Sequence, residues 1–156
     1  MRWNLKSKPE KQKVQALQNT LQVDEIIATL LVQRGIETFE QAKTFFRPTL
    51  EDLHNPYLMK DMDKAVQRIE KAIENEENIL IYGDYDVDGT TAVSLVSAYL
   101  KTIYPNIATY IPDRYDEGYG ISYIGIDFAF DNDFSLIIAL DCGIKAIEKV
   151  AYASEK

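Results

Sequence analysis

The chain contains few of the residues that build covalent cross-links or histidine sites. Among its 156 residues there is one cysteine, Cys142, and one histidine, His54. A single cysteine excludes an internal disulfide and is typical of a reducing compartment, so we expect a cytoplasmic protein. No apolar run approaches the roughly 18 residues of a membrane-spanning helix. The basic N-terminus also lacks the apolar stretch of a secretory signal, so we expect no membrane partner.

Acidic residues outnumber basic ones, but the excess is uneven along the chain. The net charge is −8. Residues 1–20 carry five basic residues against Glu10, hence +4, which leaves −12 for the rest. The basic residues are Arg2, Lys6, Lys8, Lys11 and Lys13. We interpret this arm as a solvated terminus, with a phosphate-contacting arm as the alternative. An acidic body is a poor non-specific surface for nucleic acid unless bound cations invert the local field.

Apolar periodicity predicts a helical first part and an alternating second part. Short helices are expected within residues 13–60, including a capping box at Thr38 and Gln41 and an apolar stripe stopped by Pro48. A longer helix is expected at 62–76. Strands at 79–83, 107–112 and 134–140 then alternate with helices at 90–103, 121–130 and from about 145. The predicted fold class is α/β: a parallel sheet with crossover helices in residues 61–156, preceded by a small helical N-terminal region in residues 1–60.

The most informative segment is the acidic turn that follows the first expected strand. Asp84, Asp86 and Asp88 alternate directly after an apolar run, and Gly89 follows them. Three carboxylates at a buried strand end repel one another and are costly to desolvate unless a cation lies among them. The next segment predicts a helix with one apolar face, formed by Ala92, Leu95, Val96, Tyr99 and Leu100. A strand-to-helix turn of an open α/β sheet is where ligands bind.

The acidic turn admits two other chemical interpretations and a structural one. Its first half matches a calcium-binding EF-hand loop, but the twelfth position is Leu95 instead of a glutamate, and a strand precedes it. Residues 86–90 resemble the nucleophile motif of haloacid-dehalogenase-type phosphatases. In that family, however, the attacking aspartate follows its strand directly, and the later strand ends in Thr or Ser, where this chain has Asp141. On the structural interpretation, the aspartates bind no ligand and serve only to cap helices and form Asx turns, above all Asp88.

A divalent-metal site is the third chemical interpretation. Asp141 follows the apolar run 135–140, and parallel neighbouring strands end at one edge, so Asp84, Asp86 and Asp141 could converge there. Carboxylate oxygens suit Mg²⁺ and Mn²⁺. The segment 111–120 after the middle strand adds Arg114, whose planar fork suits phosphate oxygens. Its glycines, Gly118 and Gly120, allow close approach of a ligand.

Three motifs together resemble one family. They are Gly83-Asp-Tyr-Asp-Val-Asp-Gly89, Pro112-Asp-Arg-Tyr-Asp-Glu-Gly-Tyr-Gly120 and Leu140-Asp-Cys-Gly-Ile144. They resemble the first three motifs of the DHH phosphoesterases, most of all the single-strand-specific 5′→3′ exonucleases of bacterial recombination and repair. Residues 46–48 and 53–66 resemble the lead-in of the same branch. The resemblance implies hydrolysis of single-stranded DNA from its 5′ end, with a single-strand-binding protein and a helicase as further partners.

The resemblance also implies a site with two Mn²⁺ or Mg²⁺ ions and a metal-activated water as the nucleophile. It places metal ligands at Asp84, Asp86 and Asp141, and it gives Asp88 the role of orienting the turn or a ligand. The residues expected to hold substrate phosphate or order the site are Arg114, Glu117, Gly118, Tyr119 and Gly120.

The Asp-His-His motif that names the family is absent from the sequence, and His54 lies in the lead-in. We expect that motif after one more helix and strand, so residues 61–156 are interpreted as a truncated N-terminal part of a DHH domain. Metal is expected to bind weakly or not at all, and the chain alone is expected to be inactive. Two alternatives remain: a DHH phosphoesterase acting on oligonucleotides, cyclic dinucleotides or pyrophosphate, and a non-catalytic scaffold. The lead-in argues against the first, and the intact aspartates argue against the second.

Overall fold

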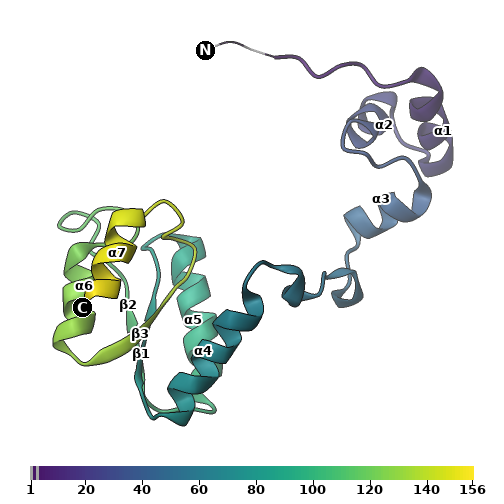
Figure 1. The fold of residues 1–156 in the computed structure, drawn as a ribbon. Coiled ribbons are helices and arrows are strands. Elements are labelled where there is room, and N and C mark those ends of the chain that lie inside the picture. The colour runs from purple at the N-terminus through teal and green to yellow at the C-terminus, as the bar shows by residue number, and fades with distance from the viewer. Residues whose placement is uncertain (1, 3) are drawn as a thin grey trace. The chain divides into compact units, whose positions relative to one another are not determined.

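The computed structural model describes residues 2 and 4–156 and divides the chain into two compact units, residues 1–58 and 59–156. The first unit contains α1 (Lys11–Leu21), α2 (Glu25–Val32) and α3 (Phe39–Phe46), followed by the short 3-10 helices η1 (Leu50–Asp52) and η2 (Pro56–Leu58) (Figure 1). Its small core consists of Val14, Leu17, Ala28, Leu31, Val32, Ile36 and Ala42. No helix in the described part of the chain is long and apolar enough to cross a membrane.

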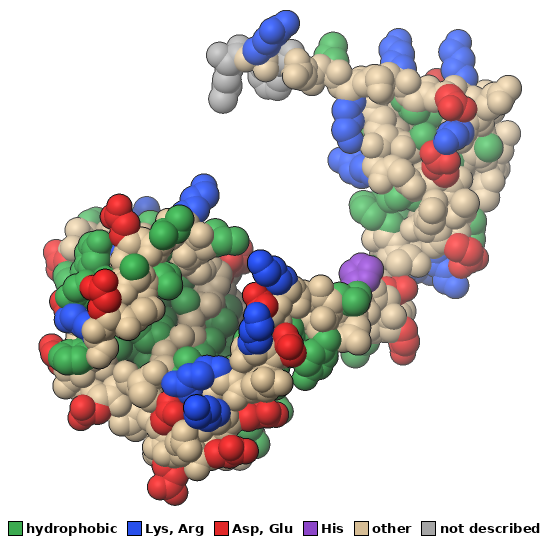
Figure 2. Space-filling model, in the orientation of Figure 1, with side chains coloured by type: hydrophobic (Ala, Val, Ile, Leu, Met, Phe, Trp, Pro, Cys, Tyr) green, Lys and Arg blue, Asp and Glu red, His purple; other side chains and the backbone are tan. Residues whose placement is uncertain are grey.

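Local signals in the first unit were predicted better than its packing. The capping box at Thr38 is confirmed: its hydroxyl accepts from the Gln41 amide, and the Gln41 side chain accepts from the Thr38 amide. Of the expected apolar stripe on α3, only Ala42 is buried, because the three phenylalanines are at least half exposed. Basic side chains gather near the N-terminal end of this unit (Figure 2). Lys6, in the basic arm, donates to the Gln33 carbonyl at 2.9 Å, so this part of the arm is anchored.

The second unit is a three-layer α/β structure, which confirms the predicted fold class. Its elements are α4 (Met62–Glu74), β1 (Asn78–Tyr82), α5 (Val87–Lys101), β2 (Ile107–Tyr110), α6 (Tyr123–Asp131), β3 (Phe134–Ala139) and α7 (Ile147–Glu155). The strands are parallel in the order β2-β1-β3. Helices α4 and α5 cover one face of the sheet, and α6 and α7 lie on the other (Figure 1). Strand β2 ends before Pro112, which has no N–H to donate to a ladder.

The central strand anchors both layers. Ile79, Leu80, Ile81 and Tyr82 of β1 are fully buried. Burying each aliphatic side chain contributes about 1.5–3 kcal/mol relative to exposure. Ile79 and Ile81 pack with residues of α4 and α5, and Tyr82 stacks on Tyr110 with ring centroids 5.2 Å apart. The end of β1 is therefore a rigid point from which the acidic turn departs.

The predicted apolar face of α5 is partly wrong. Val93, Ser97 and Leu100 are buried, whereas Leu95 and Tyr99 are 70% and 66% exposed. Apolar residues lie nearly all around this helix, so periodicity could not choose the buried face. Close backbone contact at the helix start chooses it instead, since Gly89 lies directly against the backbone of Asp84.

Candidate metal centre

Asp84 is the buried anchor of the acidic turn. It lies two positions after the last residue of β1, and its charged side chain is 0% exposed. One carboxylate oxygen accepts from the Tyr85 amide at 2.7 Å, and the other accepts from the Gly120 amide at 2.9 Å. Two backbone donors from different segments therefore fix the orientation of this carboxylate.

Asp86 is the N-cap of α5, a role that the sequence had favoured for Asp88. Its Oδ1 accepts from the Gly89 amide at 2.9 Å, and its Oδ2 accepts from the Tyr119 hydroxyl at 3.1 Å. The helix starts at Val87, three residues earlier than expected, which moves the cap from Asp88 to Asp86. Asp88 lies in the first helical turn and is exposed, where its charge complements the helix dipole.

Asp141 lies at the same edge of the sheet as Asp84. The Leu140 amide donates to the Tyr82 carbonyl at 2.8 Å, which ties the end of β3 to the end of β1. Asp141 follows at φ 56°, in the left-handed region that aspartate tolerates better than most residues, and it is exposed. The parallel pairing therefore brings the residue to the carboxyl edge, the side on which all three strands end.

Two neighbouring side chains experience the charges of all three aspartates. The hydrogen bond from the Tyr119 hydroxyl to Asp86 and the charges of Asp86, Asp84 and Asp141 raise the pKa of Tyr119 to about 12. Burial, followed by the charges of Asp84, Asp141 and Asp86, raises the pKa of the Cys142 thiol to about 11. The three carboxylates thus share one electrostatic neighbourhood.

The aspartates do not yet form a closed coordination shell. Among residues 2 and 4–156, no three His, Cys, Asp or Glu side chains lie close enough to hold one metal ion together. The oxygens of Asp84 and Asp86 instead face amides and a tyrosine hydroxyl. All three groups are hard oxygen donors, so the chemistry of the donor set fits Mg²⁺ or Mn²⁺. Their number and present orientation fit only part of a site.

Residues 112–122, termed the tyrosine loop, lie against Asp84, Tyr85 and Asp86 of the acidic turn. Its inner support is Glu117, whose carboxylate accepts from the Tyr110 hydroxyl, the Asp113 amide and the Ser122 hydroxyl. Burial and the bond to Glu117 raise the pKa of Tyr110 to about 12. Gly120, at φ 81°, donates to Asp84 and accepts from the Tyr82 hydroxyl at 3.1 Å. The loop is therefore bonded both to Tyr82, the last residue of β1, and to Asp84 of the acidic turn.

Arg114 lies over the turn through an aromatic contact that the sequence did not indicate. Its guanidinium carbon is 5.4 Å from the centroid of the Tyr85 ring. Tyr85 in turn packs edge-to-face with Tyr119 at 5.8 Å between centroids. Such cation–π contacts orient a guanidinium without neutralising it. The only signal for this arrangement was an aromatic residue between two of the motif aspartates.

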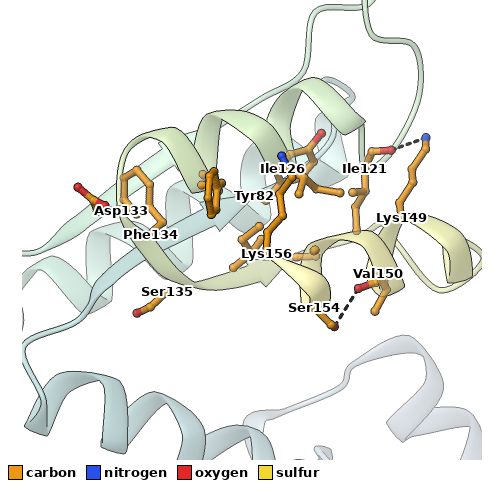
Figure 3. A pocket seen from close by; sticks show the side chains of 15 residues that line it. Tyr82, Ile121, Ile126, Asp133, Phe134, Ser135, Lys149, Val150, Ser154 and Lys156 are labelled. Atoms are coloured by element: carbon orange, nitrogen blue, oxygen red, sulfur yellow. Dashed lines mark hydrogen bonds between the residues drawn. The ribbon is translucent and has the colours of Figure 1, made fainter.

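Two cavities lie on the α6/α7 side of the sheet. The first, of about 750 Å³, is lined by the end of the tyrosine loop and by residues 141–149, including Asp141 and Lys145. The second, of about 730 Å³, lies between α6, β3 and α7 and is mostly apolar (Figure 3). Lys149 lines both and donates to the Ile121 carbonyl. Of these two cavities, only the first is lined by one of the three site aspartates, Asp141.

Gly89→Ala should disrupt this site through backbone contact alone. A Cβ at this position would lie 2.5 Å from the Asp84 carbonyl oxygen and 2.6 Å from its amide nitrogen. Neither backbone atom can move freely, so we expect a loss of about 1–3 kcal/mol in the free energy of unfolding, measured by urea denaturation. Thr91→Ala, on an outer position of the same helix, should change it by about 0.5 kcal/mol or less. Equal stability of Gly89→Ala and wild type would contradict the close approach.

Comparison with known proteins gives a consistent family assignment. The model of the DHH family, N-terminal domain, matches residues 78–156. The chain is 39% identical over 155 residues to the single-stranded-DNA-specific exonuclease RecJ of Bacillus subtilis, covering 99% of this chain and 20% of that protein. It is 28% identical over 109 residues to the protein of the same name from Haemophilus influenzae, covering 69% and 19%. The chain thus spans about a fifth of the length of these curated relatives.

Solved structures agree with the fold. A crystal structure of exonuclease RecJ bound to manganese matches at 26% identity with a TM-score of 0.57, covering 63% of this chain and 25% of that one. RecJ in complex with Mn²⁺ from Thermus thermophilus matches at 22% identity with a TM-score of 0.65, covering 99% and 21%. At that identity the second match shows the fold alone. Together with the family match, these findings confirm the resemblance inferred from the three motifs.

Proposed function

The chain belongs to the DHH family, whose N-terminal domain matches residues 78–156, and from this premise we propose that it supplies part of a two-metal phosphodiesterase site. The proposed reaction is hydrolysis of single-stranded DNA from its 5′ end, carried out by a protein of the relatives' length of which this chain is one part. The observation that carries the proposal is geometric: the parallel strands β1 and β3 end side by side, and Asp84, Asp86 and Asp141 follow these two ends at one edge of the sheet.

The three aspartates would have different tasks in holding metal. Two Mn²⁺ or Mg²⁺ ions, when bound, supply an activated water and stabilise charge on the attacking and leaving oxygens. Asp84 is prealigned by the Gly120 and Tyr85 amides. Asp86 uses one oxygen as a helix cap, which leaves the oxygen now bonded to Tyr119 for an ion. Asp141 approaches from β3 and is free to turn because it is exposed.

The tyrosine loop would form the substrate side of the site. Arg114, oriented by Tyr85, offers a planar fork to phosphate oxygens. Glu117 holds the loop from inside, so its contribution to phosphate binding is indirect. Gly118 and Gly120, both in the left-handed region, let the backbone around Tyr119 approach a ligand closely. Asp88, at the start of helix α5, would help to orient the acidic turn.

The similarity to RecJ proteins favours single-stranded DNA over the other substrates of the family. On that basis we propose a cytoplasmic role in DNA repair and recombination, with a single-strand-binding protein and a helicase as partners. The haloacid-dehalogenase alternative requires Asp86 as a free nucleophile. The match to the DHH family argues against that role.

The test is an end-labelled nuclease assay on the protein of the relatives' length. With Mn²⁺ we expect label to be released early from 5′-labelled single strands and late from 3′-labelled ones, with little release from blunt duplex. Chelation by EDTA should abolish release, and added Mn²⁺ should restore it. Asp84→Asn should be inactive with metal, whereas Asp131→Asn, an exposed position on α6, should behave as wild type. Undiminished hydrolysis in EDTA would refute the metal mechanism, and early release of the 3′ label would refute the polarity.

A further inference from the structure

Strand β3 carries one extra residue where it begins to pair with β1. Asn78 pairs with Phe134, but the next residue, Ile79, pairs with Leu136. Ser135 is therefore left without a partner on β1, which is the arrangement of a β-bulge. From this point on, the extra residue determines which β3 residue faces each β1 residue, up to Ala139 beside Tyr82.

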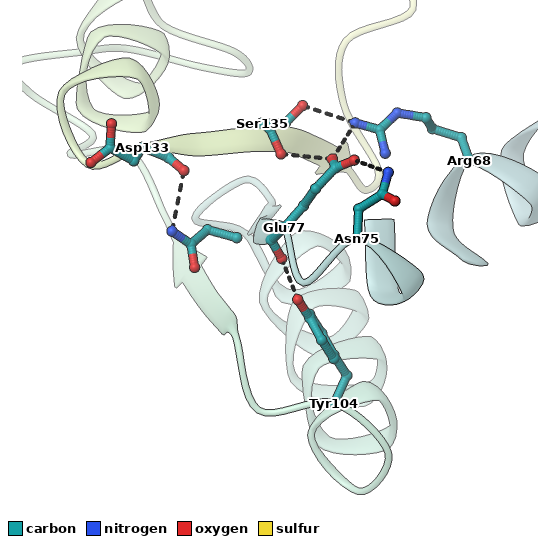
Figure 4. Close-up of polar contacts among 7 residues, drawn as sticks. Arg68, Asn75, Glu77, Tyr104, Asp133 and Ser135 are labelled. Atoms are coloured by element: carbon teal, nitrogen blue, oxygen red, sulfur yellow. Dashed lines mark hydrogen bonds and ion pairs between the residues drawn. The ribbon is translucent and has the colours of Figure 1, made fainter. Parts of the chain in front are cut away.

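An ion pair holds the hydroxyl and the carbonyl of the bulged residue. The Ser135 hydroxyl donates to Glu77 Oε2 at 2.7 Å, and the Ser135 carbonyl accepts from Arg68 Nη2 at 3.1 Å (Figure 4). Arg68 Nη2 also lies 2.7 Å from Glu77 Oε2. Arg68 belongs to α4 and Glu77 precedes β1, so three segments meet at one serine. We call these three residues the register clamp.

The register clamp is more constrained than an ordinary surface ion pair. The Glu77 side chain is only 19% exposed, and its other oxygen accepts from Asn75 at 3.3 Å. The Tyr104 hydroxyl donates to the Glu77 carbonyl at 2.6 Å, which fixes the backbone at this point (Figure 4). The bonds from Ser135 and Arg68 lower the pKa of Glu77 to about 2. Glu77 is thus a fixed, ionised acceptor at the start of the sheet.

The hydrophobic pattern of β3 specifies its register only weakly. Leu136, Ile138 and Leu140 pack with the core formed by α4 and α5. The intervening residues, Ile137 and Ala139, line the cavity beneath α6 and α7. Because both faces of this strand are apolar, a shift by one residue would still bury apolar side chains on each face. Register is poorly determined in strands of this kind unless another contact fixes it.

We propose that Arg68 and Glu77 are positioning residues that hold Ser135 out of the ladder and thereby set Asp141 beside Asp84. Without the bulge, Ile79 would pair with Ser135, and every later β3 residue would move by one position. Asp141 would then lie about 3.3 Å further along the strand, with its side chain turned to the other face. The inference rests on the proposed function only for the reason why Asp141 has to lie beside Asp84. The register of β1 and β3 can be measured without metal.

The test is the pairing of β1 with β3 in the 156-residue chain, observed by NMR through interstrand contacts between backbone protons. Wild type should show the contacts of the Ile81/Ile138 pairing. In Glu77→Ala and Arg68→Ala these contacts should weaken, contacts of an Ile81/Ile137 pairing should appear, and amide exchange in β3 should accelerate about tenfold or more. The β1–β2 contacts should persist, which shows that the unit remains folded. Lys64→Ala breaks the exposed Lys64–Asp61 pair on the same helix and should leave β3 unchanged.

A conservative variant keeps the test decisive if Glu77→Ala fails to fold. Glu77→Gln retains an acceptor for the Ser135 hydroxyl but loses the charge that attracts Arg68, so its β3 exchange should lie between wild type and Arg68→Ala. Native β1–β3 contacts with unchanged exchange in both Arg68→Ala and Glu77→Gln would overturn the proposal. Dilute Mn²⁺ separates the two hypotheses. If Mn²⁺ broadens wild-type signals near Asp84 but leaves those near Asp141 sharp, the shared metal site is refuted while the register result still stands.

Discussion

Replacing Asp141 by alanine in the protein of the relatives' length should reduce Mn²⁺-dependent nuclease activity at least about 100-fold. Loss of a group that merely supports a metal ligand costs about 10–100-fold, and loss of a ligand itself should cost more. The measurement is initial release of nucleotides from 5′-labelled single strands at saturating Mn²⁺. The haloacid-dehalogenase alternative gives Asp141 no catalytic part and predicts near-normal activity.

The chain provides a closely matched control for this substitution. Asp133 lies just before the start of β3 at φ 57°, and Asp141 lies just beyond its end at φ 56°. Both positions are exposed, and alanine is equally strained at each, so both variants should lose similar stability, about 1 kcal/mol. Only Asp141→Ala should lose activity. Asp86→Ala is a weaker test, because it also removes the N-cap of α5, which by itself costs about 1 kcal/mol.

The 156-residue chain alone should show negligible turnover of single-stranded DNA and weak binding of Mn²⁺. Three aspartates on one edge offer too few ligands to fix two ions, and the described residues contain no cluster that closes a metal shell. We expect release of nucleotides no faster than in an Asp84→Asn chain purified in parallel. That variant is the control for contaminating nuclease. Turnover that is efficient, sensitive to EDTA and lost in Asp84→Asn would contradict the incomplete-site account.

The sequence predicted the sheet well because its signals are local. Each strand is a short apolar run, and each ends at a glycine, proline or aspartate, so the predicted bounds agree with the structure to within one or two residues. The placement of Asp84 and Asp141 at one edge followed from parallel pairing alone. The start of α5 was missed because Asp86 serves two purposes, as a motif residue and as the helix cap, and only the first was visible in the sequence.

Contacts between distant segments account for what was missed. Tyr119 bonds Asp86 across 33 positions, and Ser135 bonds Glu77 across 58. Neither pair follows from periodicity or capping rules. The bulge at Ser135 leaves no compositional mark either, because the residue resembles any polar position at the start of a strand. The site's outline was therefore predictable, whereas the contacts that align its groups required the structure.

The most direct test of the central claim is a titration of the 156-residue chain with dilute Mn²⁺, observed as paramagnetic broadening of assigned backbone amide signals. If Asp84, Asp86 and Asp141 converge on one ion, the signals of Gly83, Tyr85 and Cys142 should broaden together at the same Mn²⁺ concentration. Signals at the opposite edge, such as Asp133, should stay sharp. Asp84→Asn should remove the effect at all three positions. Broadening near Tyr85 that leaves Cys142 sharp would show that Asp141 does not share the site and would contradict the account.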